Sequence, residues 1–226
     1  MIDVDRPAKP PESLAAGKSY RGLDVIEALH RVFRGKCYLC ESPVTLGAIE
    51  VDHRRPQGDE RFAHLKYDWH NLFPTCASYK CNQRRIACPD GELLSPGEGV
   101  EMRVVQEVTG CPSSCLAIAG TTEFRFSPTD HRDAAAGHTV RELDHIHNDR
   151  SNFKAMELRL SIHQHVVALA SGMRMYEKLC EDPSADPAVL ADQKRWVQQW
   201  VSRDAPFTML VRSYFIHVEA VRALFD

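Results

Sequence analysis

Two cysteine pairs enclose a short segment that also carries an Asp-His pair and two asparagines. The cysteines lie in CYLC and TCASYKC, and VDHRRP and WHNLF stand between them. The residues concerned are Cys37, Cys40, Asp52, His53, Asn71, Cys76, Cys81 and Asn82. Thiolates bind zinc, carboxylate and amide oxygens suit Mg²⁺ or Mn²⁺, and a histidine can remove a proton from water near neutral pH. The segment 37–85 therefore predicts a structural metal site beside a hydrolytic site.

The cysteines are interpreted as ligands of a structural zinc ion. Four thiolates complete the tetrahedral shell of zinc and leave no open position for chemistry. The assigned ligands are Cys37, Cys40, Cys76 and Cys81. Because the second pair is spaced CxxxxC, wider than the usual CxxC, Cys88 is an alternative ligand, and four unrelated buried cysteines are the alternative to any metal. Cys111 and Cys115 have no second pair to join and are interpreted as inert.

The polar residues between the cysteine pairs are suited to phosphodiester hydrolysis, which needs an activated water and compensation for developing charge. Asp52 and Asn82 are expected to hold a catalytic Mg²⁺ or Mn²⁺, with His53 as the base. Adjacent residues on a regular strand point to opposite faces, so the strand predicted at 48–53 must end or distort at this pair. Pro56 and Gly58, which lie a few residues after His53, favour such an end.

The motifs VDHRRP, HNL and CN, enclosed by cysteine pairs, resemble the HNH endonuclease family. The resemblance implies a zinc-stapled ββα-metal core, treble-clef-like, that carries one catalytic metal. It implies that His53 is the general base, that Asp52 and Asn82 bind the metal, and that Asn71 braces the loop. The last motif position is often His in the family and is Asn82 here, so the chain is similar to an HNN variant. A wider resemblance, including the PP arm and LLSPGEGVE, connects the chain to HNH proteins encoded beside anti-phage ATPases in Septu and retron systems.

Basic residues around the motif are candidates for phosphate contacts. They are Arg54, Arg55, Lys80, Arg84 and Arg85. The segment 31–90 carries ten basic and seven acidic residues, whereas the whole chain has a net charge of −3, which argues against a protein that coats nucleic acid through bulk charge. DNA is the favoured nucleic acid, although these residues do not distinguish it from RNA. The alternative is that these side chains are only solvated.

The chain predicts an α+β fold in four parts. Residues 1–22 form a Pro-rich extended arm, in which the prolines oppose any helix. Residues 23–90 form the nuclease core, with helices expected at 23–34 and 81–87. Residues 91–138 form an insert of loops and short antiparallel strands, expected at 100–108, 116–119 and 123–126. Residues 139–226 are mostly helical, with one helix starting at Asp186-Pro187 and the last at Asp204 to Pro206.

Apolar residues of the helical region predict a protein interface. A stripe at 153, 156, 160, 167 and 170 is widened by a second at 162, 166, 169, 173 and 176. Aromatic residues also lie on these helices, at Trp196, Trp200, Phe207 and Phe215. Because aromatic residues are favoured at interfaces, we expect this region to dock a larger partner, possibly an ATPase encoded nearby. The alternative is that the helices pack only on one another.

The chain has no run of about 18 apolar residues and its N-terminal segment lacks a signal-peptide core, so we expect a cytoplasmic protein without membrane contact. Paired cysteines in a reducing compartment favour metal binding over disulfides. The expected activity is that of a metal-dependent endonuclease, the effector of an anti-phage defence complex. The alternative is a non-catalytic zinc treble-clef module that binds nucleic acid or a protein, which would not need Asp52, His53 and Asn82 together.

Overall fold

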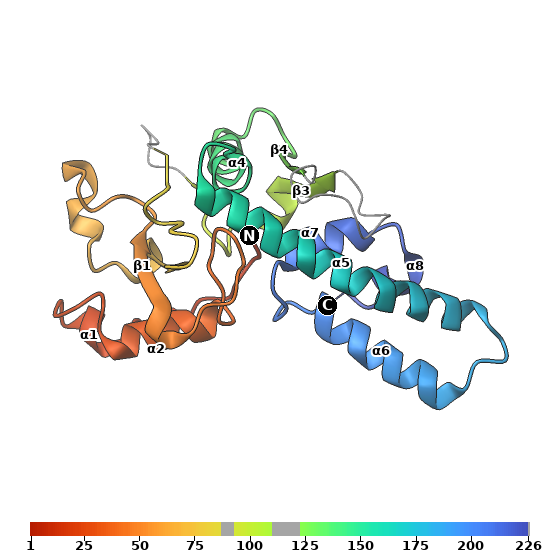
Figure 1. Cartoon of the computed structure of the whole chain (residues 1–226). Helices are drawn as coiled ribbons and strands as arrows, with labels where there is room; N and C mark the ends of the chain where they lie inside the picture. Colours follow the sequence, from red (N-terminus) through yellow and green to blue (C-terminus); the bar gives the residue numbers. More distant parts are fainter. Residues whose placement is uncertain (87–92, 110–122, 226) are drawn as a thin grey trace.

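The computed structural model describes residues 1–86, 93–109 and 123–225. The fold is α+β, with about half of the chain helical and two small antiparallel sheets. The α-helices are α1 (Glu12–Ala15), α2 (Leu23–Val32), α3 (Val100–Arg103), α4 (Ala134–Asn148), α5 (Phe153–Glu181), α6 (Pro187–Val201), α7 (Thr208–Phe215) and α8 (Glu219–Arg222). The strands are β1 (Ile49–His53), β2 (Leu72–Cys76), β3 (Val104–Thr109) and β4 (Glu123–Pro128). Figure 1 shows α1, α2 and β1 at one end of the molecule and the α5–α6 pair at the other.

The N-terminal arm is extended over its first residues and then forms the one-turn helix α1, which the proline content did not predict. Pro11 is the residue before the first turn, a position where its missing N–H costs nothing. The arm is part of the core, because Met1, Ile2 and Val4 are buried. Its Arg6 packs between aromatic rings and donates a 2.9 Å hydrogen bond to the carbonyl of Leu72.

The segment 23–76 contains the helix and the two strands that carry the site. The predicted helix 23–34 is confirmed as α2, which ends at Val32, and both Arg34 (φ +55°) and Gly35 (φ +65°) then lie in the left-handed region. β1 and β2 form an antiparallel pair in which Ile49 faces Cys76 and His53 faces Leu72. The helix predicted at 81–87 is absent from its described part: residues 81–84 form hydrogen-bonded turns, and residues 85 and 86 follow in irregular conformation.

The insert forms a two-stranded sheet whose strands β3 and β4 pair in antiparallel register. The strand predicted at 123–126 is confirmed, but only the second part of the one predicted at 100–108 is extended, because residues 100–103 form α3. The carboxylate of Asp3 explains this, since it accepts hydrogen bonds from the amides of Gly97 (3.0 Å) and Val100 (2.9 Å) at the start of that turn. The predicted strand 116–119, and Cys88, Cys111 and Cys115, lie outside the described residues.

The C-terminal region is helical as predicted, and α6 begins at Pro187 with the carboxylate of Asp186 accepting from the amide of Ala188 at 2.8 Å. The last predicted helix start is displaced, because α7 begins at Thr208 after Phe207, whose φ is +53°. The predicted apolar stripe of α5 is buried at Ile162, Val166, Leu169, Met173 and Tyr176. The first half of the other stripe is exposed, at Phe153, Met156 and Leu160.

The path of α6 explains the difference between the two halves of α5. α6 runs back along the second half of α5, where Trp196 lies against Gly172 and Trp200 contacts His165 with ring centroids 5.0 Å apart (Figure 1). A methyl group at Gly172 would come within 2.4 Å of the Trp196 ring, so this packing requires glycine. The aromatic residues expected to dock a partner are thus engaged within the helical region, with Phe207 and Phe215 buried.

Candidate functional site

The β1–β2 pair separates the two predicted sites along its length. Cys76 faces Ile49 at one end of the pair, and Asp52 and His53 face Phe73 and Leu72 at the other. With a rise of about 3.3 Å per residue, four residues of strand separate the two ends by roughly 13 Å. One short hairpin therefore positions the cysteine cluster and the Asp-His pair at opposite ends.

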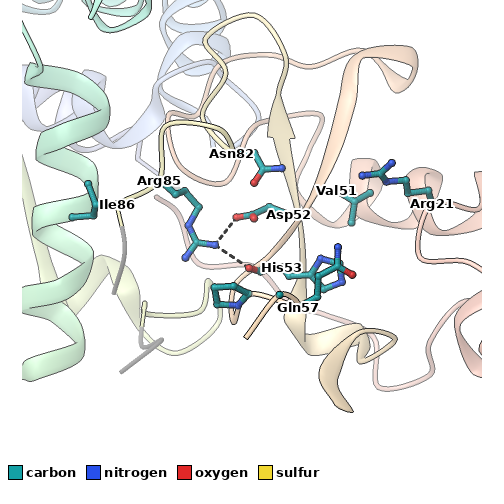
Figure 2. A pocket seen from close by; sticks show the side chains of 10 residues that line it. Arg21, Val51, Asp52, His53, Gln57, Asn82, Arg85 and Ile86 are labelled. Atoms are coloured by element: carbon teal, nitrogen blue, oxygen red, sulfur yellow. Dashed lines mark hydrogen bonds and ion pairs between the residues drawn. The ribbon is translucent and has the colours of Figure 1, made fainter. Parts of the chain in front are cut away.

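The Asp-His end opens into a pocket of about 400 Å³, called here the hairpin pocket. It is lined by Arg21, Val51, Asp52, His53, Pro56, Gln57, Gly58, Asn82, Arg85 and Ile86 (Figure 2). Asp52 and His53 both reach it although they are neighbours in sequence. Side chains of a regular strand alternate between its two faces, but β1 ends at His53. Both side chains of the pair can therefore lie at the same pocket. The structure thus brings three of the four predicted catalytic residues, Asp52, His53 and Asn82, to one pocket.

The Asp52 carboxylate is buried and has two different oxygens. Its Oδ2 accepts a hydrogen bond from the hydroxyl of Tyr38 at 2.6 Å and forms an ion pair with Arg85 at 2.9 Å. Its Oδ1 has no hydrogen-bond partner among the described residues. Burial raises the pKa of Asp52, and the charge of Arg85 and the Tyr38 hydroxyl oppose that rise. Oδ1 is therefore the oxygen left for an external ligand.

The imidazole of His53 is oriented by a backbone carbonyl. Its Nε2 lies 3.0 Å from the carbonyl oxygen of Lys66, and since a carbonyl can only accept, Nε2 carries the proton. In the neutral ring Nδ1 is then the atom with a free lone pair. Burial lowers the pKa of His53, which keeps the ring neutral at physiological pH. The Tyr20 ring packs edge-on against the imidazole, with centroids 4.8 Å apart.

The two asparagines have different environments. Asn71 is buried and braces the loop after β1, because its Oδ1 accepts from the amide of Arg55 at 2.8 Å and its Nδ2 donates to the Arg55 carbonyl at 3.1 Å. Asn82 is half-buried at the wall of the hairpin pocket, where Figure 2 shows its amide beside the Asp52 carboxylate. Asn71 therefore has a positioning geometry, whereas Asn82 can present an oxygen to the pocket.

The predicted phosphate-binding residues divide into outward and inward side chains. Lys80 is exposed. Arg84 is buried and donates to the carbonyl of Ile146 in α4 at 2.5 Å. Arg85 donates to the carbonyls of His53 (2.9 Å) and Arg54 (3.0 Å) in addition to pairing with Asp52. The Arg54 guanidinium donates to the carbonyl of Leu93 at 2.6 Å, and that of Arg55 stacks on Phe62. Three of the five, Arg54, Arg84 and Arg85, are thus committed to internal contacts.

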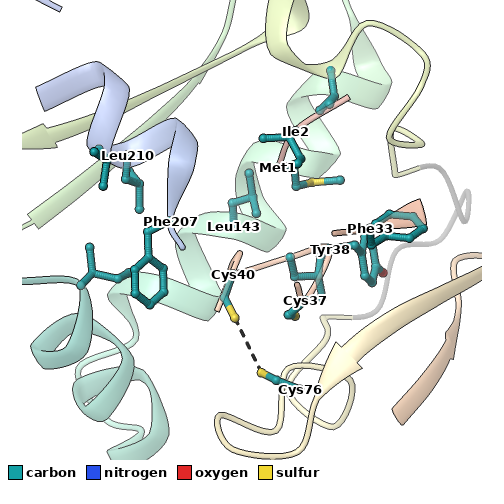
Figure 3. Close-up of a cluster of buried hydrophobic side chains, with 14 of the residues drawn as sticks. Met1, Ile2, Phe33, Cys37, Tyr38, Cys40, Cys76, Leu143, Phe207 and Leu210 are labelled. Carbon is teal, nitrogen blue, oxygen red and sulfur yellow. Dashed lines mark hydrogen bonds between the residues drawn. The ribbon is translucent and has the colours of Figure 1, made fainter. Parts of the chain in front are cut away.

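The four assigned cysteines form one buried cluster whose sulfur atoms all lie within 4.8 Å of one another. Among the described residues this is the cluster of His, Cys, Asp and Glu side chains with metal-binding geometry. The Sγ atoms of Cys40 and Cys76 are 3.6 Å apart (Figure 3). Those of Cys76 and Cys81 are 3.5 Å apart. A Zn–S bond of about 2.3 Å places tetrahedral sulfurs about 3.8 Å apart, so the cluster has the dimensions to bind a metal such as zinc.

The buried thiols of the cluster need a bound cation in order to ionise together. Burial raises the pKa of the Cys37 thiol, and hydrogen bonding to the other three cysteines raises that of Cys81. Hydrogen bonds from Cys37, Cys40 and Cys81 lower the pKa of Cys76 instead. Ionising all four in this buried place requires a positive charge at the centre.

The knuckle around the first cysteine pair is anchored to the C-terminal helices. Glu41, with φ +57°, is buried, and its backbone carbonyl and carboxylate accept from the amides of Phe207 and Met209, both at 3.1 Å. Burial alone would raise the pKa of Glu41, but the Met1 amino group and Lys36 hold it below its ordinary value. Figure 3 shows Cys37 and Cys40 beside Met1, Leu143 and Phe207.

Several site residues had no recognised signal in the sequence. Tyr38 lies inside CYLC, between two metal-ligand candidates, and its hydroxyl reaches Asp52. Glu142 of α4 is fully buried with its Oε2 accepting from the amide of Ile86 at 3.1 Å, and its Oε1 has no partner among the described residues. Arg21 lines the hairpin pocket from the N-terminal arm, about thirty residues before Asp52. Only the position of Tyr38 within the motif offered a hint.

Comparison with known proteins gives no match: no family model, curated protein or solved structure is significantly similar to the chain. Across the described residues, no helix has the length and apolar character needed to cross a membrane. The functional assignment therefore depends on the motif residues and their geometry.

Proposed function

We propose that the protein is a metal-dependent endonuclease that hydrolyses phosphodiester bonds, with DNA as the favoured substrate. The observation that supports it is the convergence of Asp52, His53 and Asn82 on one pocket beside a four-cysteine cluster. A binding module has no need for a base, a carboxylate and an amide at one pocket. The sequence motif that resembles the HNH family contains the same three residues.

The donor set fits a hard divalent cation. Asp52 Oδ1 has no partner among the described residues and the Asn82 amide lies beside the carboxylate, and oxygens of these types suit Mg²⁺ or Mn²⁺. Bound there, Mg²⁺ or Mn²⁺ would supply a Lewis acid for the scissile phosphate. Asp52 and Asn82 would hold it, and Zn²⁺ would occupy the cysteine cluster as a structural ion.

The chain's own residues supply the proton transfer. His53 presents Nδ1 as acceptor because Lys66 fixes its Nε2 proton, so it can take the proton of an attacking water. Asn71 holds the loop that follows His53 and thereby maintains this orientation. Arg85 keeps Asp52 in place through its Oδ2 and leaves Oδ1 to the pocket.

The decisive experiment compares cleavage of supercoiled DNA by the wild type, His53→Ala and His70→Ala, with Mg²⁺ or Mn²⁺. His70 is the matched control, because it is an exposed histidine of the same segment. We expect His53→Ala to lose cleavage by at least about 100-fold, the typical contribution of a general base, while zinc content and melting temperature stay unchanged. Equal cleavage by His53→Ala and the wild type would refute the assignment.

An accompanying protein partner and a role in anti-phage defence are part of the proposal and depend on the sequence resemblance. The partner would be an ATPase encoded beside the gene. Co-expression of the genomic neighbour with the full chain, followed by co-purification and an assay of cleavage with ATP, tests this part. The same assay separates the rival function, a non-catalytic zinc module, which would bind nucleic acid or the partner and cleave nothing.

A further inference from the structure

Arg21 is a second cation of the hairpin pocket and differs from Arg85 in its availability. The Arg85 guanidinium is occupied by Asp52 and by backbone carbonyls. Arg21 is exposed, and its guanidinium forms no hydrogen bond or ion pair among the described residues. It stacks on the Tyr20 ring, 5.3 Å from the centroid. A pocket wall thus carries a positive charge without an anionic partner.

Tyr20 fixes the position of this charge relative to His53. Its ring packs edge-on against the imidazole of His53 at 4.8 Å, and its hydroxyl accepts a hydrogen bond from Gln57 at 3.3 Å. The arm is itself held in the core, because Arg6 is bonded to the carbonyl of Leu72. Tyr20 therefore couples the arm to the proposed base through a direct ring contact.

Lys66 is a second exposed cation near His53. Its carbonyl orients the imidazole, and its ammonium lies 5.3 Å over the ring of Tyr67. The Tyr67 and Tyr20 rings are 6.3 Å apart.

We propose that Arg21 and Lys66 bind the phosphodiester backbone of the substrate next to His53, with Tyr20 and Tyr67 as their supports. This rests on the proposed function and assigns its phosphate contacts, in place of the inward-facing Arg84 and Arg85. Exposed guanidinium and ammonium groups flanking a base are the groups that neutralise phosphates and set the register of a nucleic acid. The N-terminal arm is then part of the substrate-binding surface.

The test measures binding of a fluorescent DNA duplex and of the matching single strand to variants in a His53→Ala background, so that the substrate survives. Arg21→Ala is compared with Arg31→Ala, which removes an exposed arginine from the neighbouring helix α2 outside the hairpin pocket. We expect Arg21→Ala and Lys66→Ala each to weaken binding by about threefold to tenfold at low salt. The slope of log affinity against log salt should become shallower by about one for each variant. Arg21→Lys should retain most of the affinity, and Arg31→Ala should match the parent.

Cleavage by the same variants in the wild-type background gives a second readout, in which KM rises for Arg21→Ala while kcat changes little. If the parent binds DNA and Arg21→Ala has the same affinity and salt slope as Arg31→Ala, the inference is wrong and the proposed function stands. If the parent neither binds nor cleaves any nucleic acid, the proposed function fails and the inference fails with it.

Discussion

The two ends of the β1–β2 pair use polar side chains in opposite ways. At the Cys76 end, the sulfur atoms face one another, are fully buried and have no access to solvent. At the His53 end, Asp52 and His53 are also buried, but both line a pocket and each keeps one acceptor atom without a partner among the described residues. A closed set of ligands can stabilise a fold and an open one can bind and transform a substrate. Under the proposed function, the hairpin therefore separates stability from chemistry, and Tyr38, which lies between the cysteines and hydrogen-bonds to Asp52, joins the two ends.

The largest effect is expected at the closed end. Replacing Cys81 with Ser should abolish metal retention and unfold the N-terminal half, because the binding free energy of a structural zinc ion, about 10 kcal/mol or more, is comparable to the stability of a whole domain. Cys180→Ser is the matched control, since Cys180 is exposed near the end of α5. Metal content by mass spectrometry and melting temperature measure both variants. If the Cys81→Ser protein keeps its metal, the fourth ligand is Cys88 and not Cys81.

Local sequence signals predicted the elements that short-range forces decide. The cysteine pairs, the helix α2 and the strand β1 follow from residues within a few positions of one another, whereas the strand β2 was not predicted. The Asp186-Pro187 helix start is another such case. The closed end of the hairpin was therefore largely predictable, because its four ligands are all chemically distinctive residues.

The open end was less predictable because its partners are distant in sequence and chemically ordinary. Arg85 is one of many arginines, and nothing near it indicates the ion pair with Asp52 across more than thirty residues. Glu142 reaches the same region from α4, and Arg21 from the arm. The exposure of the first half of the α5 stripe was unpredictable for the same reason. Periodicity identifies an apolar face of a helix but does not show how far α6 extends along it.

A smaller effect is expected from Glu142, which lies near the open end. Burial raises its pKa to about 7, above the ordinary value of 4.5, although Arg85 and the Ile86 amide oppose this. The folded state therefore holds a proton that the unfolded state has released, and this carboxyl's contribution to stability falls as pH rises from about 4.5 to about 7. Glu142→Gln should raise the free energy of unfolding by about 3 kcal/mol at pH 8 and by about 2 kcal/mol at pH 6.

Urea denaturation at the two pH values measures this difference. Glu181→Gln, an exposed substitution at the end of α5, is the control and should show no change at either pH. If Glu142→Gln destabilises the protein at pH 8, the buried carboxylate makes a net favourable contribution through Arg85, and the open end resembles the closed one in being stabilised by its charges.

The smallest effect, and the sharpest test of how the two ends are joined, is expected from Tyr38→Phe. The ring is buried and keeps its packing on Phe73 as phenylalanine, so the substitution removes only the hydroxyl that donates to Asp52 at 2.6 Å. A buried hydrogen bond to a charged group contributes about 1.5 kcal/mol or more, so the melting temperature should fall by a few degrees while zinc is retained. Because Asp52 then keeps only Arg85 as a partner, its carboxylate is held less firmly, and the Mn²⁺ concentration for half-maximal cleavage should rise severalfold.

Tyr79→Phe is the control, because the Tyr79 hydroxyl bonds to Ser161 and not to Asp52. If Tyr38→Phe shows the stability loss without a change in the Mn²⁺ requirement, the hydroxyl supports the fold alone and the two ends of the hairpin act independently.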